Sequence, residues 1–154
     1  MPIRHAIWTV GQTPQELRLS RLPSEQLLED MIAANPSILS DEWMPIGRQE
    51  RTSYDGRIDL IAIAPDGSLI LIEIKRDRTP REVAAQALDY ASWIEQLEPE
   101  DIGRMYERFS KGRNLKEDFE KRFGHSIPDE ELNQSHQIII VAAELDESTE
   151  RIVR

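Results

Sequence analysis

The chain has 154 residues, with 19 lysine or arginine side chains against 29 aspartate or glutamate side chains, and a formal net charge of −10. This length suits one domain, and a hydrophobic content of 39% is enough for a folded core. So acidic a chain does not hold nucleic acid by overall charge, and such a partner needs a local basic patch or a bound cation. The chain has no cysteine, which excludes disulfides, thiolate zinc sites and cysteine nucleophiles.

No stretch has the roughly 20 apolar residues of a membrane span or the apolar core of a signal peptide. The sequence therefore predicts a soluble, cytoplasmic protein without a membrane partner. Residues 147–154 resemble the start of a helix with no stop signal. This leaves open whether the polypeptide is a fragment of a longer chain.

Residues 1–23 are expected to form a short strand over 3–10 and then an ordered loop. A helix should begin after Ser24, a favourable N-cap, and end near Asn35–Pro36, because the residue before a proline is pushed out of helical geometry.

Two glutamates lie on this helix. With Leu27, Leu28, Met31 and Ile32 defining its apolar arc, Glu25 lies against the edge of the arc and Glu29 a step further toward solvent. Any glutamate used inside the fold is therefore expected to be Glu25. The alternative, given equal weight, is that both are surface residues that complement the helix dipole.

The centre of the chain predicts a β-hairpin. Residues 57–64 and 69–76 are rich in aliphatic side chains and flank the turn Pro65-Asp66-Gly67-Ser68. Both faces of each strand carry aliphatic residues, so we expect a sheet covered on both sides. A second helix should begin at Thr79-Pro80-Arg81-Glu82, which supplies an N-cap, a proline at the first position and a capping-box glutamate, and run to about Leu97.

Residues 98–135 are highly charged, with helical segments predicted around 101–109 and 115–123. Residues 137–143 then predict a buried strand of the kind found inside α/β sheets. The order of elements predicts an α/β fold with a mixed central sheet flanked by helices.

Charged residues interrupt the aliphatic hairpin. If Ala64 opposes Ser68 across the turn, Asp59 lies opposite Glu73, and Lys75 shares the face of Glu73. Carboxylates opposed in this way have side-chain carbons about 5 Å apart and repel each other, and burial strengthens the repulsion.

Three kinds of compensation are open: a shared proton, the ammonium group of Lys75, or a divalent cation. Mg²⁺ or Mn²⁺ bound by Asp59, Glu73 and the backbone carbonyl of Ile74 balances both charges, with Glu25 as a direct or water-mediated ligand. Lys75 is then free to orient or deprotonate water, or to stabilise charge on a phosphate. The alternative is a salt-bridged hairpin with a purely structural role.

Asp59, followed fourteen residues later by Glu73-Ile74-Lys75, resembles the signature of the PD-(D/E)xK, or restriction-endonuclease-like, superfamily. The segments 56–60 and 71–76 are similar to the catalytic domain of NucS-type endonucleases, the mismatch-specific enzymes of archaea and actinobacteria. The glutamate that these enzymes carry ten residues before an Asn-Pro pair is matched by Glu25, and residues 86–90 resemble their QxxxY element. The resemblance covers roughly residues 24–97.

The resemblance implies a restriction-endonuclease-like core over residues 24–154, with a charged insertion at about 98–135. It implies that Asp59 and Glu73 bind metal, that Lys75 is the catalytic lysine, and that Glu25 and Gln86 lie at the site. For Gln86, an amide hydrogen-bonded at the core edge is an equal alternative. NucS-type enzymes carry a separate N-terminal domain, whereas only 23 residues precede Ser24, so the resemblance does not transfer mismatch recognition.

Arginines gather between positions 48 and 81 and form a candidate nucleic-acid patch, with a solvated charged rim as the alternative. The candidate contacts are Arg48, Arg51, Arg57, Arg76, Arg78 and Arg81. Backbone amides at the start of the second helix would add a phosphate contact.

Together these observations predict a metal-dependent endonuclease that hydrolyses phosphodiester bonds in nucleic acid, with DNA as the expected substrate, Mg²⁺ or Mn²⁺ as cofactor and a role in DNA repair. The sequence leaves open whether the substrate is DNA or RNA. A homodimer is compatible with this prediction. Two alternatives remain: a non-catalytic nucleic-acid-binding or assembly module on the same fold, and a metal-dependent hydrolase of small nucleotides.

Overall fold

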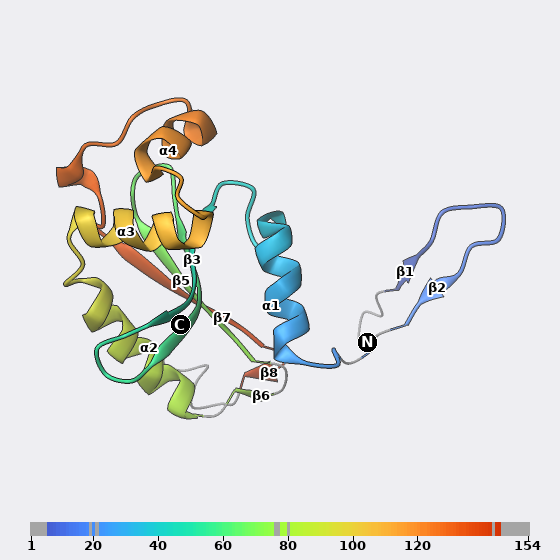
Figure 1. Ribbon diagram of the computed structural model, residues 1–154. Coiled ribbons are helices and arrows are strands. Elements are labelled where there is room, and N and C mark those ends of the chain that lie inside the picture. The colour runs from blue at the N-terminus through green and yellow to red at the C-terminus, as the bar shows by residue number, and fades with distance from the viewer. Residues whose placement is uncertain are drawn as a thin grey trace.

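The computed structural model describes residues 6–18, 20, 22–75, 78–79, 81–142 and 144–145, and at 78, 79, 81, 144 and 145 the backbone alone. A four-stranded sheet lies at its centre, in the order β3-β4-β5-β7 (Figure 1). The strands are β3 (Met44–Arg51), β4 (Arg57–Ile63), β5 (Leu69–Ile74) and β7 (His136–Val141). Neighbours run antiparallel except β5 and β7, which are parallel. The predicted mixed sheet is confirmed.

Helices cover both faces of this sheet (Figure 1). On one face, Ile32 of α1 (Glu25–Ala34) packs with Leu60 and Ile72 in one apolar cluster. On the other face, α2 (Arg81–Ile94), α3 (Pro99–Ser110) and α4 (Leu115–Phe123) enclose a larger cluster that includes Ile61 and Leu71. The prediction of a sheet covered on both sides is therefore confirmed.

The remaining elements are short. They are the 3-10 turns η1 (Pro36–Ile38) and η2 (Asp129–Glu131), the antiparallel pair β1 (Ile7–Trp8) and β2 (Glu16–Leu17), and the parallel pair β6 (Arg78–Thr79) and β8 (Glu144–Leu145). Within the described ranges, no helix is both long and apolar enough to pass through a membrane.

The N-terminal segment forms a hairpin that stands away from the sheet and its helices (Figure 1). The loop expected before Pro23 is therefore partly wrong, since β2 pairs with β1. Hydrogen bonds between Thr9 and Gln15, with N···O distances of 2.9 and 3.0 Å, close the turn. The strands pair Ile7 with Leu17 and Trp8 with Glu16, and β2, with two residues, is too short for an alternating pattern to indicate it. Of the strand expected over 3–10, residues 3–5 lie outside the described residues.

The helix predicted after Ser24 is confirmed: Ser24 Oγ accepts a hydrogen bond from the Leu27 backbone N–H at 3.1 Å, and the helix ends at Ala34. The prediction that Glu25, and not Glu29, is the glutamate used inside the fold is wrong with respect to burial. Glu29 is buried, with 4% of its surface exposed, whereas Glu25 is exposed.

The cause of this error is the assumed apolar arc. Leu27 and Met31 remain 40% and 43% exposed. The face that packs on the sheet is centred on Ile32, and Glu29 lies beside it one turn earlier. Residues at i and i+3 share a helix face whatever their polarity, so Glu29 is buried because Ile32 is.

The central hairpin has the predicted register. Ile61 pairs with Leu71, Ile63 pairs with Leu69, and the Ala64 N–H donates to the Ser68 carbonyl at 2.9 Å. Gly67, in the turn, has a φ of 82°, a conformation that favours glycine.

Strand β3 has no counterpart in the prediction. Pro45, Gly47 and the charged residues at its end hide the alternation of apolar and polar side chains that would have indicated a strand. Proline is tolerated here because β3 is at the edge of the sheet, with β4 as its neighbour. Strand β7 occupies the other edge. Its residues 138–141 are therefore half-buried, not fully buried as expected.

The charged segment 98–135 folds onto the core. Both helices predicted there are confirmed as α3 and α4, and their apolar faces place Ile102, Met105, Leu115 and Phe119 in the larger cluster. Helix α3 has a capping box in which Glu98 and Asp101 bond each other's backbone. The segment therefore completes the core, and one of its charged residues, Asp118, is itself buried and accepts a hydrogen bond from the Tyr106 hydroxyl.

A close contact joins α2 to the start of β4. A Cβ added at Gly56 would lie 2.5 Å from Cε1 of the Tyr90 ring and 2.8 Å from Thr52 Oγ1. Only glycine therefore allows Tyr90 to approach the chain just before Asp59.

We predict that Gly56→Ala lowers the free energy of unfolding by about 1–3 kcal/mol, because a methyl group overpacks this contact. Urea denaturation followed by circular dichroism measures the change. Gly103→Ala is the matched control: it lies inside α3 with no atom within 4 Å of the added Cβ, and should stabilise by about 0.5–1 kcal/mol. A Gly56→Ala variant as stable as the wild type would contradict the contact.

Candidate functional site

Asp59, Glu73 and Lys75 lie where β4 and β5 end. Backbone pairing extends to Leu60 and Ile72, one residue short of the expected pair of Asp59 and Glu73. Beyond that point Asp59 Oδ2 accepts a hydrogen bond from the Ile74 backbone N–H at 2.7 Å. The carboxylate of Asp59 thus takes the place of a backbone partner and is fixed to the neighbouring strand.

The carboxyl group of Glu73 has a strongly raised pKa. Burial, and then the negative charge of Asp59, raise its pKa to about 7, and the hydrogen bond from Lys75 only partly opposes this. Lys75 Nζ lies 3.0 Å from Glu73 Oε1. Glu73 Oε2 is buried and has no hydrogen-bond partner among the described residues. Such an oxygen is costly to bury.

The pKa values of Asp59 and Lys75 are also shifted by burial and by neighbouring charges. Burial raises the pKa of Asp59, opposed by the Ile74 N–H and reinforced by the charge of Glu29. For Lys75, burial alone would lower the pKa, but the hydrogen bond and charge of Glu73 outweigh it, and the pKa is raised. Lys75 is therefore an ammonium at neutral pH.

Glu25 belongs to the same electrostatic environment. Its charge helps to raise the pKa of both Glu73 and Lys75. It projects from the first turn of α1, where a carboxylate also complements the helix dipole. Its role as a helix carboxylate of the site stays a prediction.

Gln86 lies one helical turn before Tyr90, and its Nε2 donates to the Tyr90 hydroxyl at 2.5 Å. That hydroxyl donates to the Arg57 carbonyl at 2.8 Å and accepts from the Arg57 N–H at 3.2 Å. Burial raises the pKa of Tyr90, and the charge of Glu73 adds to the effect. Tyr90 therefore holds the chain two residues before Asp59, and Gln86 supports Tyr90.

Of the six arginines in the predicted nucleic-acid patch, the structure describes the side chains of three. Arg51 and Arg57 are exposed. Arg48 is held by the carboxylates of Glu29 and Asp30 on α1. Arg76 lies outside the described residues, and the side chains of Arg78 and Arg81 are likewise undescribed.

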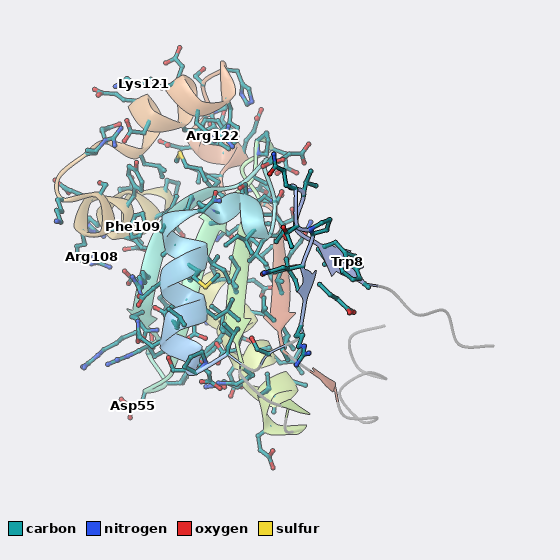
Figure 2. All side chains as sticks on the ribbon, turned by 90° about the vertical axis from the view of Figure 1, so that its right-hand side faces the viewer. Trp8, Asp55, Arg108, Phe109, Lys121 and Arg122 are labelled. Atoms are coloured by element: carbon teal, nitrogen blue, oxygen red, sulfur yellow. The ribbon has the colours of Figure 1, made fainter. Side chains whose placement is uncertain are left out.

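Lys121 and Arg122 on α4 lie at the opposite end of the molecule from Asp55, in the β3–β4 turn (Figure 2). Arg108 on α3 lies between these two ends. Arg108 also pairs with Glu50 at 3.0 Å.

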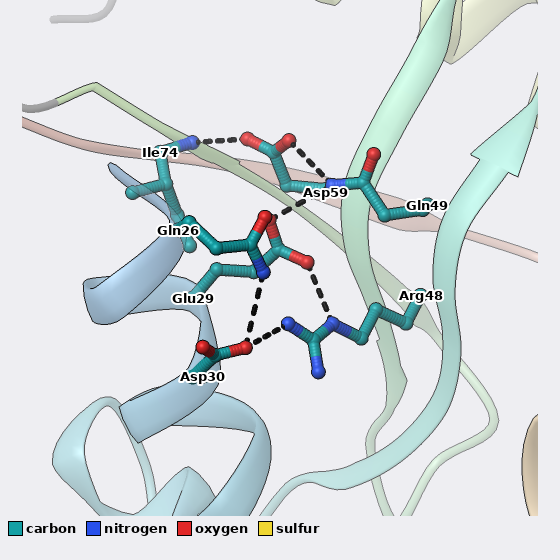
Figure 3. Close-up of polar contacts among 7 residues, drawn as sticks. All are labelled: Gln26, Glu29, Asp30, Arg48, Gln49, Asp59 and Ile74. Atoms are coloured by element: carbon teal, nitrogen blue, oxygen red, sulfur yellow. Dashed lines mark hydrogen bonds and ion pairs between the residues drawn. The ribbon is translucent and has the colours of Figure 1, made fainter. Parts of the chain in front are cut away.

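Two residues missed by the sequence analysis adjoin the carboxylates. Gln49 Nε2 donates to Asp59 Oδ1 at 3.2 Å and to Glu29 Oε2 at 2.8 Å (Figure 3). Arg48 Nε donates to Glu29 Oε1 at 2.6 Å and its guanidinium also contacts Asp30. Gln49 could not be found because its strand was not predicted, and Glu29 because its helix face was assigned to solvent.

Comparison with known proteins places this arrangement in context. No family model matches the chain. Over 68 residues, which make up 44% of this chain and 27% of the relative, the sequence is 31% identical to Endonuclease NucS of Sulfolobus acidocaldarius. The chain therefore spans about a quarter of the length of this curated relative.

Solved structures extend the likeness to nearly the whole chain. A repair endonuclease from Pyrococcus abyssi superposes with a TM-score of 0.54 at 15% identity, over 96% of this chain and 60% of that one. A complex of EndoMS with dsDNA gives 0.54 at 15% identity, over 97% and 60%. EndoMS in its apo form gives 0.52 at 16% identity, over 97% and 59%. The resemblance to NucS-type endonucleases is confirmed. At these identities the structures establish the NucS-type fold, which the mixed sheet and its flanking helices display.

We predict that Glu73 makes the metal-free protein less stable as the pH rises. Its pKa is higher in the folded protein, about 7, than the ordinary value of 4.5, so the folded state binds the proton more tightly. The contribution is complete below pH 4.5 and is lost as the pH rises through about 7. Relative to Glu73→Gln, wild-type stability should fall by roughly 3 kcal/mol between pH 4.5 and 8.

Urea denaturation across this pH range, in the presence of a chelator, measures the difference. Glu107→Gln changes an exposed glutamate on α3 and should leave the wild-type pH dependence unaltered. Parallel curves for the wild type and Glu73→Gln would show that Glu73 is not perturbed.

Proposed function

We propose that this chain is a metal-dependent endonuclease domain that hydrolyses phosphodiester bonds in DNA and acts in DNA repair. The observation that carries the proposal is the pairing of two buried or half-buried carboxyls, Asp59 and Glu73, beside Lys75, with Glu73 Oε2 lacking a partner among the described residues. The likeness in sequence and fold to repair endonucleases supports it.

The carboxyl pair fits a divalent cation. A cation of charge +2 would relieve the repulsion that helps to raise the pKa of Glu73, and it would bind Glu73 Oε2, which has no hydrogen-bond partner among the described residues. All the available donors are oxygen atoms, which suits Mg²⁺ or Mn²⁺. Within the described residues, no group of three or more carboxylate or imidazole side chains is arranged around a metal position. The ligands would therefore be Asp59, Glu73, the Ile74 carbonyl and water, with Glu25 acting through water.

When bound, such a cation would polarise the phosphate and lower the pKa of a bound water. The chain's own residues supply the rest. Lys75, kept protonated by Glu73, is suited to stabilise negative charge on the phosphate and to orient the attacking water through its N–H groups. Asp59 is held by Ile74, so its carboxylate needs no reorganisation as charge develops.

DNA is favoured over other phosphodiesters for two reasons. One similar structure is a complex of EndoMS with dsDNA. Arg51 and Arg57, at the ends of strands adjoining the site, are exposed and would contact backbone phosphates in a chain whose net charge is −10.

We predict that Asp59→Asn, Glu73→Gln and Lys75→Met each lower Mg²⁺- or Mn²⁺-dependent cleavage of labelled DNA by at least about 100-fold. The first two remove a carboxylate ligand of the cation, and the third removes the positive charge that stabilises the phosphate. Initial rates on double-stranded, single-stranded and mismatched oligonucleotides measure the effect. Asp89→Asn, on the exposed face of α2, should cleave like the wild type. Full cleavage by Asp59→Asn would refute the assignment.

We also predict that Mn²⁺ stabilises the wild type but not Glu73→Gln. Binding to the folded state alone stabilises by about 2.7 kcal/mol at a concentration 100 times the Kd, and should raise the melting temperature. Calorimetry and thermal unfolding with and without Mn²⁺ measure this. If the wild type binds DNA but no Mn²⁺, the chain is a non-catalytic nucleic-acid-binding module.

A further inference from the structure

Gln49 has an unusual backbone for a residue inside a strand. Its φ is 52°, a left-handed conformation that side chains other than glycine rarely adopt. Its neighbours Arg48 and Glu50 pair with Leu60 and Ile58, so Gln49 lies across from Asp59. Residues held in such conformations concentrate at functional sites, where the surrounding structure enforces them.

Strand β4 is irregular at the same point. Ile58 and Ile61 pack in the same apolar cluster, although strict alternation would place residues three apart on opposite faces of the sheet. The pleat is therefore interrupted at Asp59, facing the strained residue of β3. The two distortions together bring the carboxylate of Asp59 within reach of the Gln49 amide.

The contacts of Gln49 are specific. Its Nε2 donates one hydrogen bond to Asp59 Oδ1 at 3.2 Å and another to Glu29 Oε2 at 2.8 Å (Figure 3). Both partners are carboxylates and accept hydrogen bonds, so the NH₂ group of the amide, and not its oxygen, faces them. Since Ile74 N–H holds the other oxygen of Asp59, the carboxylate is fixed from both sides.

Glu29 anchors this arrangement. It is buried, and its other oxygen accepts from Arg48 Nε at 2.6 Å, so its charge is matched by a guanidinium. A buried, paired carboxylate is a rigid acceptor. It holds the Gln49 amide in place, and the amide separates the carboxyl groups of Glu29 and Asp59.

We propose that Gln49 is a positioning residue for Asp59: it orients the metal-binding carboxylate through one N–H and is itself oriented by Glu29 through the other. This inference rests on the proposed function. Gln49 does not touch the reacting phosphate; it acts by keeping Asp59 in one orientation. Partners of this kind around metal ligands change metal affinity strongly when they are removed.

Calorimetric titration of the full chain with Mn²⁺ at fixed pH tests the proposal, with two substitutions at position 49. Gln49→Leu keeps the bulk and removes the amide. Gln49→Gly removes the amide and also relieves the left-handed backbone. We expect both to weaken Mn²⁺ binding by about 10- to 100-fold and to lower kcat for DNA cleavage more than they raise KM.

The two variants separate positioning from a structural role. If Gln49 serves only the backbone of β3, Gln49→Gly should bind Mn²⁺ as the wild type does, and that result overturns the proposal. Urea denaturation checks that each variant is folded, and Gln49→Gly is expected to be at least as stable as Gln49→Leu. Gln137→Leu, at an exposed glutamine on β7, is the matched control and should leave Mn²⁺ affinity unchanged.

The outcomes also distinguish this inference from the function on which it depends. A wild type that binds Mn²⁺ and cleaves DNA, together with position 49 variants of unchanged affinity, overturns the inference alone. A wild type that binds no Mn²⁺ overturns the proposed function, and the role of Gln49 with it.

Discussion

The central constraint on the site is the electrostatic repulsion between two carboxyl groups that the sheet holds close together and shields from water. Asp59 and Glu73 project from neighbouring strands, and burial raises the pKa of both. Among the described residues, the ammonium group of Lys75 lies beside them and balances one of the two negative charges when both carboxyls are ionised. Folding alone would not favour such a cluster. Under the proposed function, a divalent cation would supply the positive charge that this cluster needs.

Hydrogen bonds from three elements hold Asp59 and the start of its strand in place despite this repulsion. Tyr90 fixes the start of β4 through both backbone groups of Arg57. The Ile74 N–H restrains one oxygen of Asp59 from β5, and Gln49 restrains the other from β3. Each restraint comes from a different element, so the position of the carboxylate is set by tertiary structure and not by the hairpin alone.

The sequence was sufficient where local patterns control structure. The turn and aliphatic matching determined the hairpin register, including Ile61 opposite Leu71, and the Ser24 cap determined where α1 starts. Prediction failed where tertiary contacts outweigh polarity. Glu29 shares the buried face of α1 with Ile32, and its carboxylate is tolerated there because Arg48 and Gln49 of β3 donate to it. The sequence of α1 does not contain those two partners. Strand β3 was missed because an edge strand tolerates proline, glycine and charge.

The parallel pairing of β5 with β7 bears on how the chain assembles. Strands β4 and β5 are joined by residues 64–68, whereas residues 75–135 separate β5 from β7. Contacts so distant along the chain form slowly, because a long loop must close first. During synthesis, the strand that carries Glu73 therefore remains an open edge until His136–Val141 emerges. A nascent chain stopped before that point would expose this edge to other chains, and would lack the neighbour that sets the position of Ile74 beside Asp59.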